Sequence, residues 1–173
     1  LRENTGPVVL GPTKQGMRAV STEGVYEADV YVVAAGAWTD EVTGRYCLSR
    51  ITPVRGQLVF YSTPSNYLSA PVFTRSHGYV VPKRKGYSLV GSTAEDVGYD
   101  NSTTDEAMVD LIKKGQHLVP GLSRCDLRGI SAGLRPKSRD DLPVIGAVPG
   151  RENIILAAGH FRNGMLLAPV TGE

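Results

Sequence analysis

The sequence predicts a mixed fold in which an α+β segment is inserted into an α/β segment. Two short apolar runs predict buried strands: Val30–Ala35 has the composition of a parallel strand that is buried on both faces, and Ile154–Ala158 that of a buried strand. Each run is followed by a glycine and a helix start. Between them, residues 51–148 alternate β-prone stretches with turn signals and contain one amphipathic helical pattern. We therefore expect a mostly antiparallel sheet with a covering helix in the middle, and a final strand and helix that return to the first domain.

The first 48 residues lead into and out of the first buried strand. Residues 8–27 carry three turn signals, which predict a small antiparallel excursion: Gly11-Pro12, Gln15-Gly16 and Glu23-Gly24. The predicted strand 29–35 ends at Gly36, and Ala37–Glu41 has the acidic first turn of a helix. A glycine at this point either lets a ligand approach the backbone closely or is needed only for packing of the helix on the strand.

A domain boundary is predicted near residue 48, where the pattern changes to that of an antiparallel sheet. Residues 51–60 predict one strand, and Tyr79–Pro82 and Tyr87–Gly91 predict a hairpin with Lys83–Gly86 at its tip. The basic tip is typical of a solvated turn, because no aromatic platform for a nucleic acid adjoins it in sequence.

A helix and two more strands complete the central region. Thr103 and Glu106 have capping-box spacing, and apolar residues recur at helical intervals until Pro120-Gly121 ends the pattern. Strands are predicted at residues 127–134 and 144–148. The helix should cover one face of the sheet.

Composition excludes several classes of protein. At 173 residues, with 41% hydrophobic and 21% charged residues, the chain has enough apolar mass for a core. A formal net charge of +2 gives no reason to expect nucleic acid or an anionic membrane as a partner, and no apolar stretch has the length of a membrane span. Cys47, Cys125 and the three histidines lack metal-type or paired spacing, so we expect no metal and a reducing, cytoplasmic environment.

The junction after the last strand has the features of a ligand site. Ile154–Ala158 predicts a strand, Gly159–Gly164 a polar turn, and the apolar residues after it a helix in which Pro169 fits only the first turn. Such a junction directs free N–H groups and the positive end of a helix dipole to one place, which suits an electron-rich ligand. The alternative is an ordinary crossover without a ligand.

Three further side chains have chemistry that a ligand site could use. Arg135 lies at the end of a predicted strand, where Pro136 restricts the backbone, and its guanidinium can bind a carboxylate through two parallel hydrogen bonds. Tyr79 and His77 are two residues apart and would share one face of their strand. The alternatives are a surface or ion-paired arginine and partly buried aromatic side chains with satisfied polar atoms.

The residues of the final junction, Gly-His-Phe-Arg-Asn-Gly at 159–164 followed by Met-Leu-Leu-Ala-Pro, resemble the flavin-contacting turn of the FAD-dependent D-amino-acid oxidase superfamily, and within it the glycine oxidases of thiamine biosynthesis. Other landmarks of this family recur in order through nearly the whole chain. They lie at Ala28–Trp38, Pro53–Leu58, His77–Pro82, Gly91–Thr93 and Ala132–Gly146.

The resemblance implies a division by function. Residues 1–48 would be the C-terminal part of a Rossmann-like FAD-binding domain, 49–150 an inserted substrate-binding domain, and 151–173 a strand and truncated helix that return to the FAD domain. Family positions that touch the cofactor correspond to Gly36, Gly159, His160, Phe161, Arg162, Asn163, Gly164, Met165 and Leu166. Those that touch the substrate correspond to Arg135, Tyr79, Arg162 and His77.

The activity that the resemblance implies is oxidation of glycine or another small amino acid by O2, which gives an oxo acid, ammonia and hydrogen peroxide. A sarcosine, D-proline or D-amino-acid oxidase, or a non-catalytic module derived from such an enzyme, stays open, as does a homo-oligomer. The G-x-G-x-x-G fingerprint that holds a dinucleotide pyrophosphate is not present in these 173 residues. We therefore expect this chain by itself to be an inactive fragment that binds FAD weakly or not at all.

Two positions depart from the family pattern. Ala94 stands where glycine oxidases can carry a larger side chain, and Gly78 is smaller than some of its counterparts. If both flank the substrate, the pocket should accept something larger than glycine.

Overall fold

The computed structural model describes residues 3–13, 16–46, 50–75 and 78–173. Contacts between Cα atoms divide the chain into two compact units, each of which is described by itself. The terminal unit comprises Leu1–Pro53 and Arg135–Glu173, and the central unit comprises Val54–Leu134. The division into cofactor and substrate domains at residues 48 and 150 is a functional assignment and stays a prediction.

The terminal unit contains two three-stranded sheets. Its strands are β1 (Val9–Pro12), β2 (Met17–Ser21), β3 (Gly24–Tyr26), β4 (Tyr31–Val33), β10 (Val144–Val148) and β11 (Arg151–Ala158). Its helices are α1 (Thr39–Thr43) and α3 (Gly164–Thr171), with 3₁₀ turns at Gly36–Trp38 and Gly44–Tyr46. In the first sheet β1, β2 and β3 pair antiparallel in sequence order, which confirms the predicted excursion.

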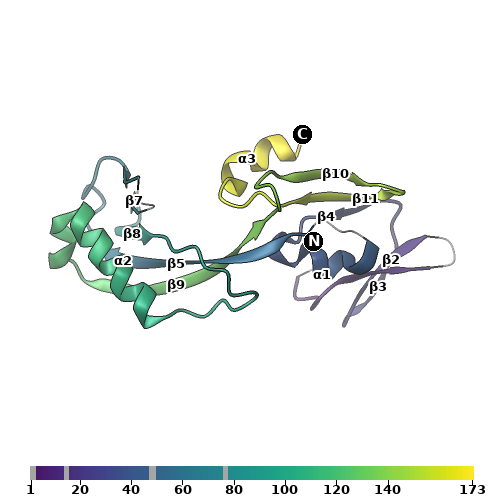
Figure 1. Cartoon of the computed structure of the whole chain (residues 1–173), viewed down its shortest axis with the longest axis horizontal. Helices are drawn as coiled ribbons and strands as arrows, with labels where there is room; N and C mark the ends of the chain where they lie inside the picture. The colour runs from purple at the N-terminus through teal and green to yellow at the C-terminus, as the bar shows by residue number, and fades with distance from the viewer. Residues whose placement is uncertain (1–2, 14–15, 47–49, 76–77) are drawn as a thin grey trace. The chain divides into compact units, whose positions relative to one another are not determined.

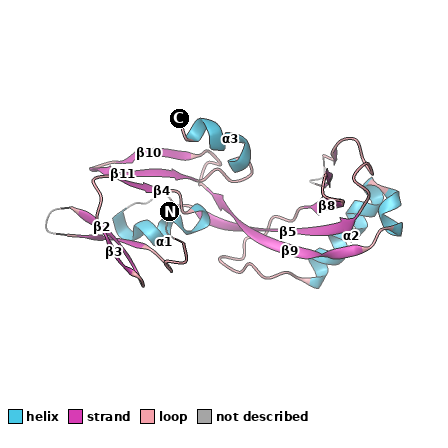
Figure 2. Ribbon diagram, turned by 180° about the vertical axis from the view of Figure 1, so that it is seen from behind, coloured by secondary structure: helices cyan, strands magenta, loops and turns pink. Residues whose placement is uncertain are grey.

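The second sheet of this unit joins the two predicted buried strands. Its order is β10-β11-β4, and β11 pairs parallel with β4, with Ile154 opposite Tyr31 and Leu156 opposite Val33 (Figure 2). The buried members of the core are Leu10, Met17, Tyr31, Val33, Val148, Ile154 and Leu156. Val42 of α1 and Tyr46 pack against this core. Helix α1 therefore lies on the face of the sheet that carries the buried core side chains.

Burial on both faces was predicted for the first strand, and this is wrong within the described residues. Tyr31 and Val33 are buried, whereas Val30 and Val32 are 50% and 65% exposed. The alternation arises because successive side chains of a strand point to opposite faces, and the core of this unit lies on only one of them.

The position of Pro169 also differs from expectation. Helix α3 begins at Gly164, so Pro169 lies in its second turn and inside the helix. A proline there cannot donate to the carbonyl of Met165. The helix ends soon afterwards, and Gly172 N donates to the carbonyl oxygens of both Ala168 and Pro169.

The central unit is built around a five-stranded sheet with the order β6-β7-β8-β5-β9. Its elements are β5 (Thr52–Ser62), β6 (Val72–Phe73), β7 (Tyr79–Lys83), β8 (Tyr87–Gly91), α2 (Asp105–Leu118), a 3₁₀ turn at Pro120–Arg124, and β9 (Leu127–Lys137). The first residues of β5 and the last of β9 belong to the terminal unit. The predicted hairpin is confirmed, with Lys83 opposite Tyr87 and the turn at Gly86 in a conformation with φ +77° that favours glycine.

Helix α2 covers one face of this sheet (Figure 1). Its buried Leu111 packs with Val59, Tyr61, Val80 and Val90, which alternate with residues of the opposite face along their strands. The amphipathic pattern in the sequence therefore indicated the covering helix correctly.

The cap of α2 lies one residue later than the capping-box spacing predicted. Thr104, not Thr103, is the N-cap, and its hydroxyl oxygen accepts from Ala107 N at 3.3 Å. A contact from another element selects this register: Gln57 Oε1 accepts from Thr104 N at 2.9 Å, and Gln57 Nε2 donates to Thr104 Oγ1 at 3.2 Å. Because Gln57 is fully buried on β5, the helix start is held by the sheet.

A buried arginine connects the same strand to the loop before α2. Arg55, which is 5% exposed, donates from Nε and Nη2 to Glu95 Oε2 at 2.9 and 2.6 Å, and from Nη1 to Asp100 Oδ2 at 2.7 Å. Burial raises the pKa of Glu95, but hydrogen bonds from Thr93, Arg55 and Gln57 and the charge of Arg55 outweigh it and leave the pKa below its ordinary value. The loop is therefore held by a charge that acid would remove.

We predict that Glu95→Gln lowers the free energy of unfolding at neutral pH by on the order of 1–2 kcal/mol, because charge-assisted hydrogen bonds to Arg55 are lost. The loss is limited to this size because a quarter of the Glu95 side chain faces water, which weakens the ion pair. A carboxylate with a lowered pKa stabilises the fold above its unfolded pKa of about 4.3, and that contribution is lost as the pH falls through the folded value.

Urea unfolding at pH 7 and at pH 3 would measure both effects. The difference between the native chain and the variant should shrink in acid, and the exposed neighbour Asp96 provides the control Asp96→Asn, with little effect at either pH. An equal difference at both pH values would contradict the assignment.

Candidate functional site

Two glycine turns lie at the same edge of the terminal unit's second sheet. Gly36 follows β4 and Gly159 follows β11, and each lies three residues beyond the paired residues Val33 and Leu156. Because the two strands are parallel, both turns are at their carboxyl ends, the edge at which open α/β sheets bind ligands.

Backbone conformation favours glycine at both positions, and close packing is a further requirement at Gly159 only. A Cβ at Gly159 would lie 3.0 Å from Ile51 Cδ1 and 3.2 Å from Ser138 Cβ, and φ is +74°. Gly36 has φ +57°, yet a Cβ there would meet no atom within 4 Å. Conformation, rather than packing of the helix on the strand, therefore explains Gly36 and leaves open space beside its backbone.

The turn after β11 is bound to the last residues of β9. Phe161 N donates to Pro136 O at 2.9 Å, and Lys137 and His160 form an antiparallel bridge. Arg135 immediately precedes this contact. It was predicted to end its strand, but β9 continues to Lys137 because the turn supplies the pairing partner.

Phe161 is the centre of a cationic cluster in this turn. Its φ of +47° is uncommon for a residue with a side chain, and its ring lies 5.6 Å from Lys137 Nζ and 5.4 Å from Arg162 Cζ. Lys137 also approaches Asp141 Oδ1 at 3.5 Å. Arg162 is exposed, and among the described residues no carboxylate forms an ion pair with it.

His160 connects the turn to the helix that follows. Its Nε2 lies 3.0 Å from Thr171 Oγ1, and the Thr171 hydroxyl donates its single proton to Leu167 O at 2.9 Å. The hydroxyl oxygen must then accept from His160, so Nε2 carries the proton and the Nδ1 atom of a neutral ring is an acceptor. This bond fixes the orientation of the imidazole against α3.

The start of α3 fits an apolar ring with an electron-rich edge. Met165 and Leu166 are 97% and 79% exposed, and no side chain caps the N-terminus of the helix. Uncapped N–H groups attract electron-rich atoms, and the exposed apolar side chains would be covered by an apolar ligand. The residues present, together with the open backbone at Gly36, are therefore compatible with a flavin.

In the central unit, Tyr79 lies on the face of the sheet opposite α2. It is directly across from Gly91, which in turn is across from Leu58, and a Cβ at Gly91 would be 2.5 Å from the Tyr79 hydroxyl oxygen. Phe73 borders the same ring, with the centroids 6.0 Å apart. Gly91 therefore makes room for the Tyr79 ring.

The other predicted residues of this region are less informative. His77 lies outside the described residues. Gly78 was expected to flank the substrate together with Ala94, but a Cβ at Gly78 would contact Thr74 Oγ1 at 3.4 Å and Leu118 Cδ1 at 3.5 Å. These contacts lie on the side of α2, away from Tyr79, so the small size of Gly78 does not widen a pocket on the Tyr79 face. Ala94 is exposed.

Sequence reasoning missed Lys137, Thr171 and the role of Gly91. Lys137 and Thr171 act through tertiary contacts for which the sequence has no local signal. Gly91 belonged to a recognised landmark, but only the cross-strand pairing identifies Tyr79 as its partner.

A metal cluster and a membrane-spanning helix are both absent from the described part of the chain. No group of three or more His, Cys, Asp or Glu side chains among those residues is arranged to hold a metal ion. Nor does any helix of that part have the length and apolar character needed to cross a membrane.

Comparisons with known proteins agree with the resemblance seen in the sequence. The family model described as DAO, FAD dependent oxidoreductase, matches residues 2–173. Glycine oxidase of Pseudomonas putida is 38% identical over 152 residues, which cover 87% of this chain and 41% of that protein. Hydrogen cyanide synthase subunit HcnC of Pseudomonas aeruginosa is 38% identical over 173 residues, which cover 96% of this chain and 41% of that protein.

A solved structure extends the similarity to three dimensions. The crystal structure of glycine oxidase from Geobacillus kaustophilus matches with a TM-score of 0.88 at 32% identity, over 95% of this chain and 45% of that chain. The chain thus spans less than half the length of each of these three relatives.

We predict that the His160 Nε2 proton is held by Thr171. In the native chain and in Thr171→Ser, NMR at neutral pH should detect this proton in slow exchange with water, because the hydroxyl acceptor is retained. In Thr171→Val, which keeps the shape of the side chain, the proton should exchange too fast to be observed. Its persistence in the valine variant would show that another acceptor holds the ring.

Proposed function

Because this chain belongs to the DAO family of FAD-dependent oxidoreductases, we propose that it is part of a flavin-dependent amine oxidase. The enzyme would oxidise glycine or another small amino acid with O2 and water to an oxo acid, ammonia and hydrogen peroxide. Residues 1–48 and 151–173 would belong to its Rossmann-like FAD domain, and residues 49–150, which include the whole central unit and Arg135, would form its substrate domain.

One structural observation carries this proposal. The hydrogen bond from Phe161 N to Pro136 O holds the strand that bears Arg135 against the turn that resembles a flavin contact. An oxidation by a flavin requires the substrate and the cofactor to meet in a fixed geometry. A guanidinium one residue from this contact is suited to fix the substrate.

Each candidate side chain has a role that its chemistry supports. Arg135 would bind the substrate carboxylate through two parallel hydrogen bonds, and Arg162 would add positive charge beside it. Tyr79 and His77 would complete the substrate side, with the Tyr79 hydroxyl as a donor to the carboxylate. Gly78 is not needed for this arrangement.

The cofactor would be FAD, which when bound accepts a hydride from the substrate carbon and passes the electrons to O2. Gly36 would let the cofactor approach the backbone, and Gly159, His160, Phe161, Asn163 and Gly164 would form the turn beside it. Met165 and Leu166 would contribute apolar surface and the N-terminus of α3. The pyrophosphate is not assigned to any residue here, since the fingerprint for it is not in this sequence.

Sequence identity does not separate two enzyme classes among the relatives. The identities to glycine oxidase of P. putida and to the hydrogen cyanide synthase subunit of P. aeruginosa are both 38%. The products must therefore be measured. The alternatives sarcosine, D-proline and other D-amino acids as substrates are decided by the same assay.

We predict that the protein expressed from the complete reading frame that contains these residues contains FAD and releases peroxide with glycine. If Ala94, which stands where glycine oxidases can carry a larger side chain, lines the substrate pocket, sarcosine, D-alanine and D-proline should be oxidised in a graded order. One methylene group changes selectivity by about 1–3 kcal/mol.

Peroxide, ammonia, cyanide and oxo acid would be measured with each of the four substrates. Cyanide in place of glyoxylate from glycine would assign the hydrogen cyanide synthase activity instead. A flavin-free protein, or one that releases no peroxide with any of them, would contradict the proposal, and a reading frame without the G-x-G-x-x-G fingerprint would favour a non-catalytic module.

A second prediction concerns Arg135. In the complete enzyme, Arg135→Lys should weaken carboxylate substrates by on the order of 1.5–3 kcal/mol, the strength of a charge-assisted hydrogen bond, because lysine cannot form the two-bond fork. The loss should appear as a raised KM with unchanged flavin content. The exposed Arg139 provides the matched control Arg139→Lys. Loss of FAD, or normal oxidation of glycine, would make Arg135 structural and direct attention to Arg162.

A further inference from the structure

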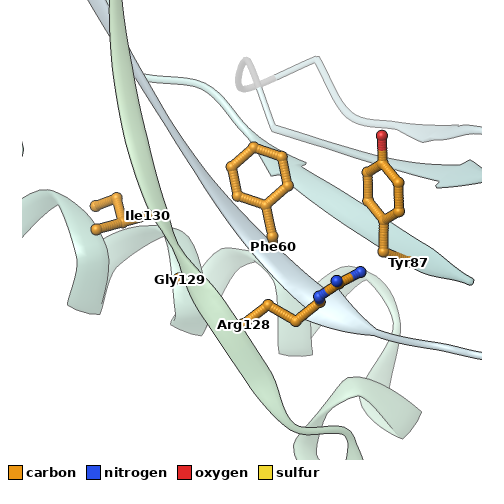
Figure 3. Close-up of a pocket in the computed structure, with 5 residues that line it drawn as sticks. All are labelled: Phe60, Tyr87, Arg128, Gly129 and Ile130. Carbon is orange, nitrogen blue, oxygen red and sulfur yellow. The ribbon is translucent and has the colours of Figure 1, made fainter.

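The central unit has a pocket that uses none of the residues proposed for substrate or cofactor. It has a volume of about 380 Å³, within the range typical of small-molecule sites. Its lining comes from three strands of the sheet: Phe60 of β5, Tyr87 of β8, and Arg128, Gly129 and Ile130 of β9 (Figure 3).

Two aromatic rings form the apolar wall of this pocket. Phe60 and Tyr87 lie on the face of the sheet opposite α2, because Phe60 alternates with the buried Val59 and Tyr61. Their ring centroids are 6.2 Å apart, with the planes inclined at 51°. Both rings are only partly buried, so they present apolar surface on which a ligand can pack.

Arg128 reaches this face because the edge strand is irregular. Arg128 and Ile130 are two residues apart and would share a face in a regular strand, yet Ile130 packs against the core below α2 while the guanidinium of Arg128 lies over Tyr87, 5.7 Å from its centroid. Gly129, with φ +153°, separates them and allows the change of direction. Figure 3 shows the Arg128 side chain extending toward Tyr87 and beneath Phe60.

Arg128 and Lys83 bring positive charge to the face that carries the two rings. Arg128 is exposed, and no carboxylate forms an ion pair with it in the described part of the chain. Lys83, at the base of the basic hairpin tip, is directly opposite Tyr87 on the neighbouring strand and so projects from the same face. A ring contact does not neutralise a guanidinium, so Arg128 keeps its hydrogen-bond donors for an anion.

We propose that this pocket binds a small carboxylate with a flat apolar body, such as an arylalkanoate. The body would stack on Phe60 and Tyr87, the carboxylate would accept hydrogen bonds from the Arg128 guanidinium, and Lys83 would add long-range attraction. The proposal does not depend on the oxidase activity, because it uses the central unit alone.

Titration of the 173-residue chain with 3-phenylpropionate, followed by NMR and calorimetry, tests this site. Saturable binding should shift the backbone signals of Tyr87, Arg128 and Gly129. Arg128→Gln should weaken it by about tenfold, because a charge-assisted pair is lost. The neutral 3-phenylpropionamide should bind about as weakly to the native chain as the carboxylate binds to this variant.

Three control variants distinguish binding in this pocket from binding elsewhere on the chain. Lys113→Gln removes an exposed positive charge from α2 and should leave the affinity unchanged, and Arg135→Gln should do the same. Arg128→Lys keeps the charge without the fork and should restore part of the affinity. Equal binding of the amide and the carboxylate, unchanged affinity in Arg128→Gln, a loss in Arg135→Gln, or no saturable binding would each overturn the proposal.

Discussion

Parallel pairing of β4 with β11 is the constraint on which the candidate site depends. The two strands are more than a hundred residues apart in sequence, and their register sets Gly36 and Gly159 at equal distances beyond the paired residues Val33 and Leu156. A shift of one residue would move the turns out of line and turn the apolar side chains to the other face. The buried faces of Ile154, Leu156, Tyr31 and Val33 therefore fix the register of the turns as well as the core.

The turn after β11 depends in the same way on contacts from outside it. Gly159 is closely approached by Ile51 and Ser138, and Phe161 donates to Pro136. On its other side His160 is held by Thr171 of α3. These contacts explain how an uncommon backbone conformation at Phe161 is maintained, because neighbouring elements determine it from both sides.

Patterns within a few residues could be predicted from the sequence, and features set by distant contacts could not. The hairpin at Tyr79–Gly91 and the helix α2 follow from turn residues and periodicity, and both were found. Thr104 replaced Thr103 as the cap because Gln57, from a distant strand, binds it. The prediction that β4 is buried on both faces was wrong because contacts with residues distant in sequence determine which face of a strand is covered.

The candidate site shows the same difference between what local sequence predicts and what distant contacts determine. The residues of the glycine turns and Arg135 were identified by residue type and family resemblance, but which side chains meet required the strand pairing. Tyr79 and Gly78 are adjacent in sequence, yet Gly78 faces α2 while Tyr79 covers Gly91 on the opposite face. A substitution at Gly78 would therefore act first on the packing of α2, a distinction that the residue types alone do not reveal.

The partners of the arginines decide which of them can bind a ligand. Arg55 is buried, and Glu95 and Asp100 neutralise its charge. Its guanidinium therefore stabilises the fold and is not available to a ligand. Arg151 is covered by the Tyr46 ring, 4.7 Å from its Cζ atom, and by the Met17 sulfur. Arg128 and Arg162 instead have an aromatic ring on one side and water on the other. An aromatic ring orients a guanidinium without using its in-plane donors, and this leaves these two arginines held in position and still able to bind an anion.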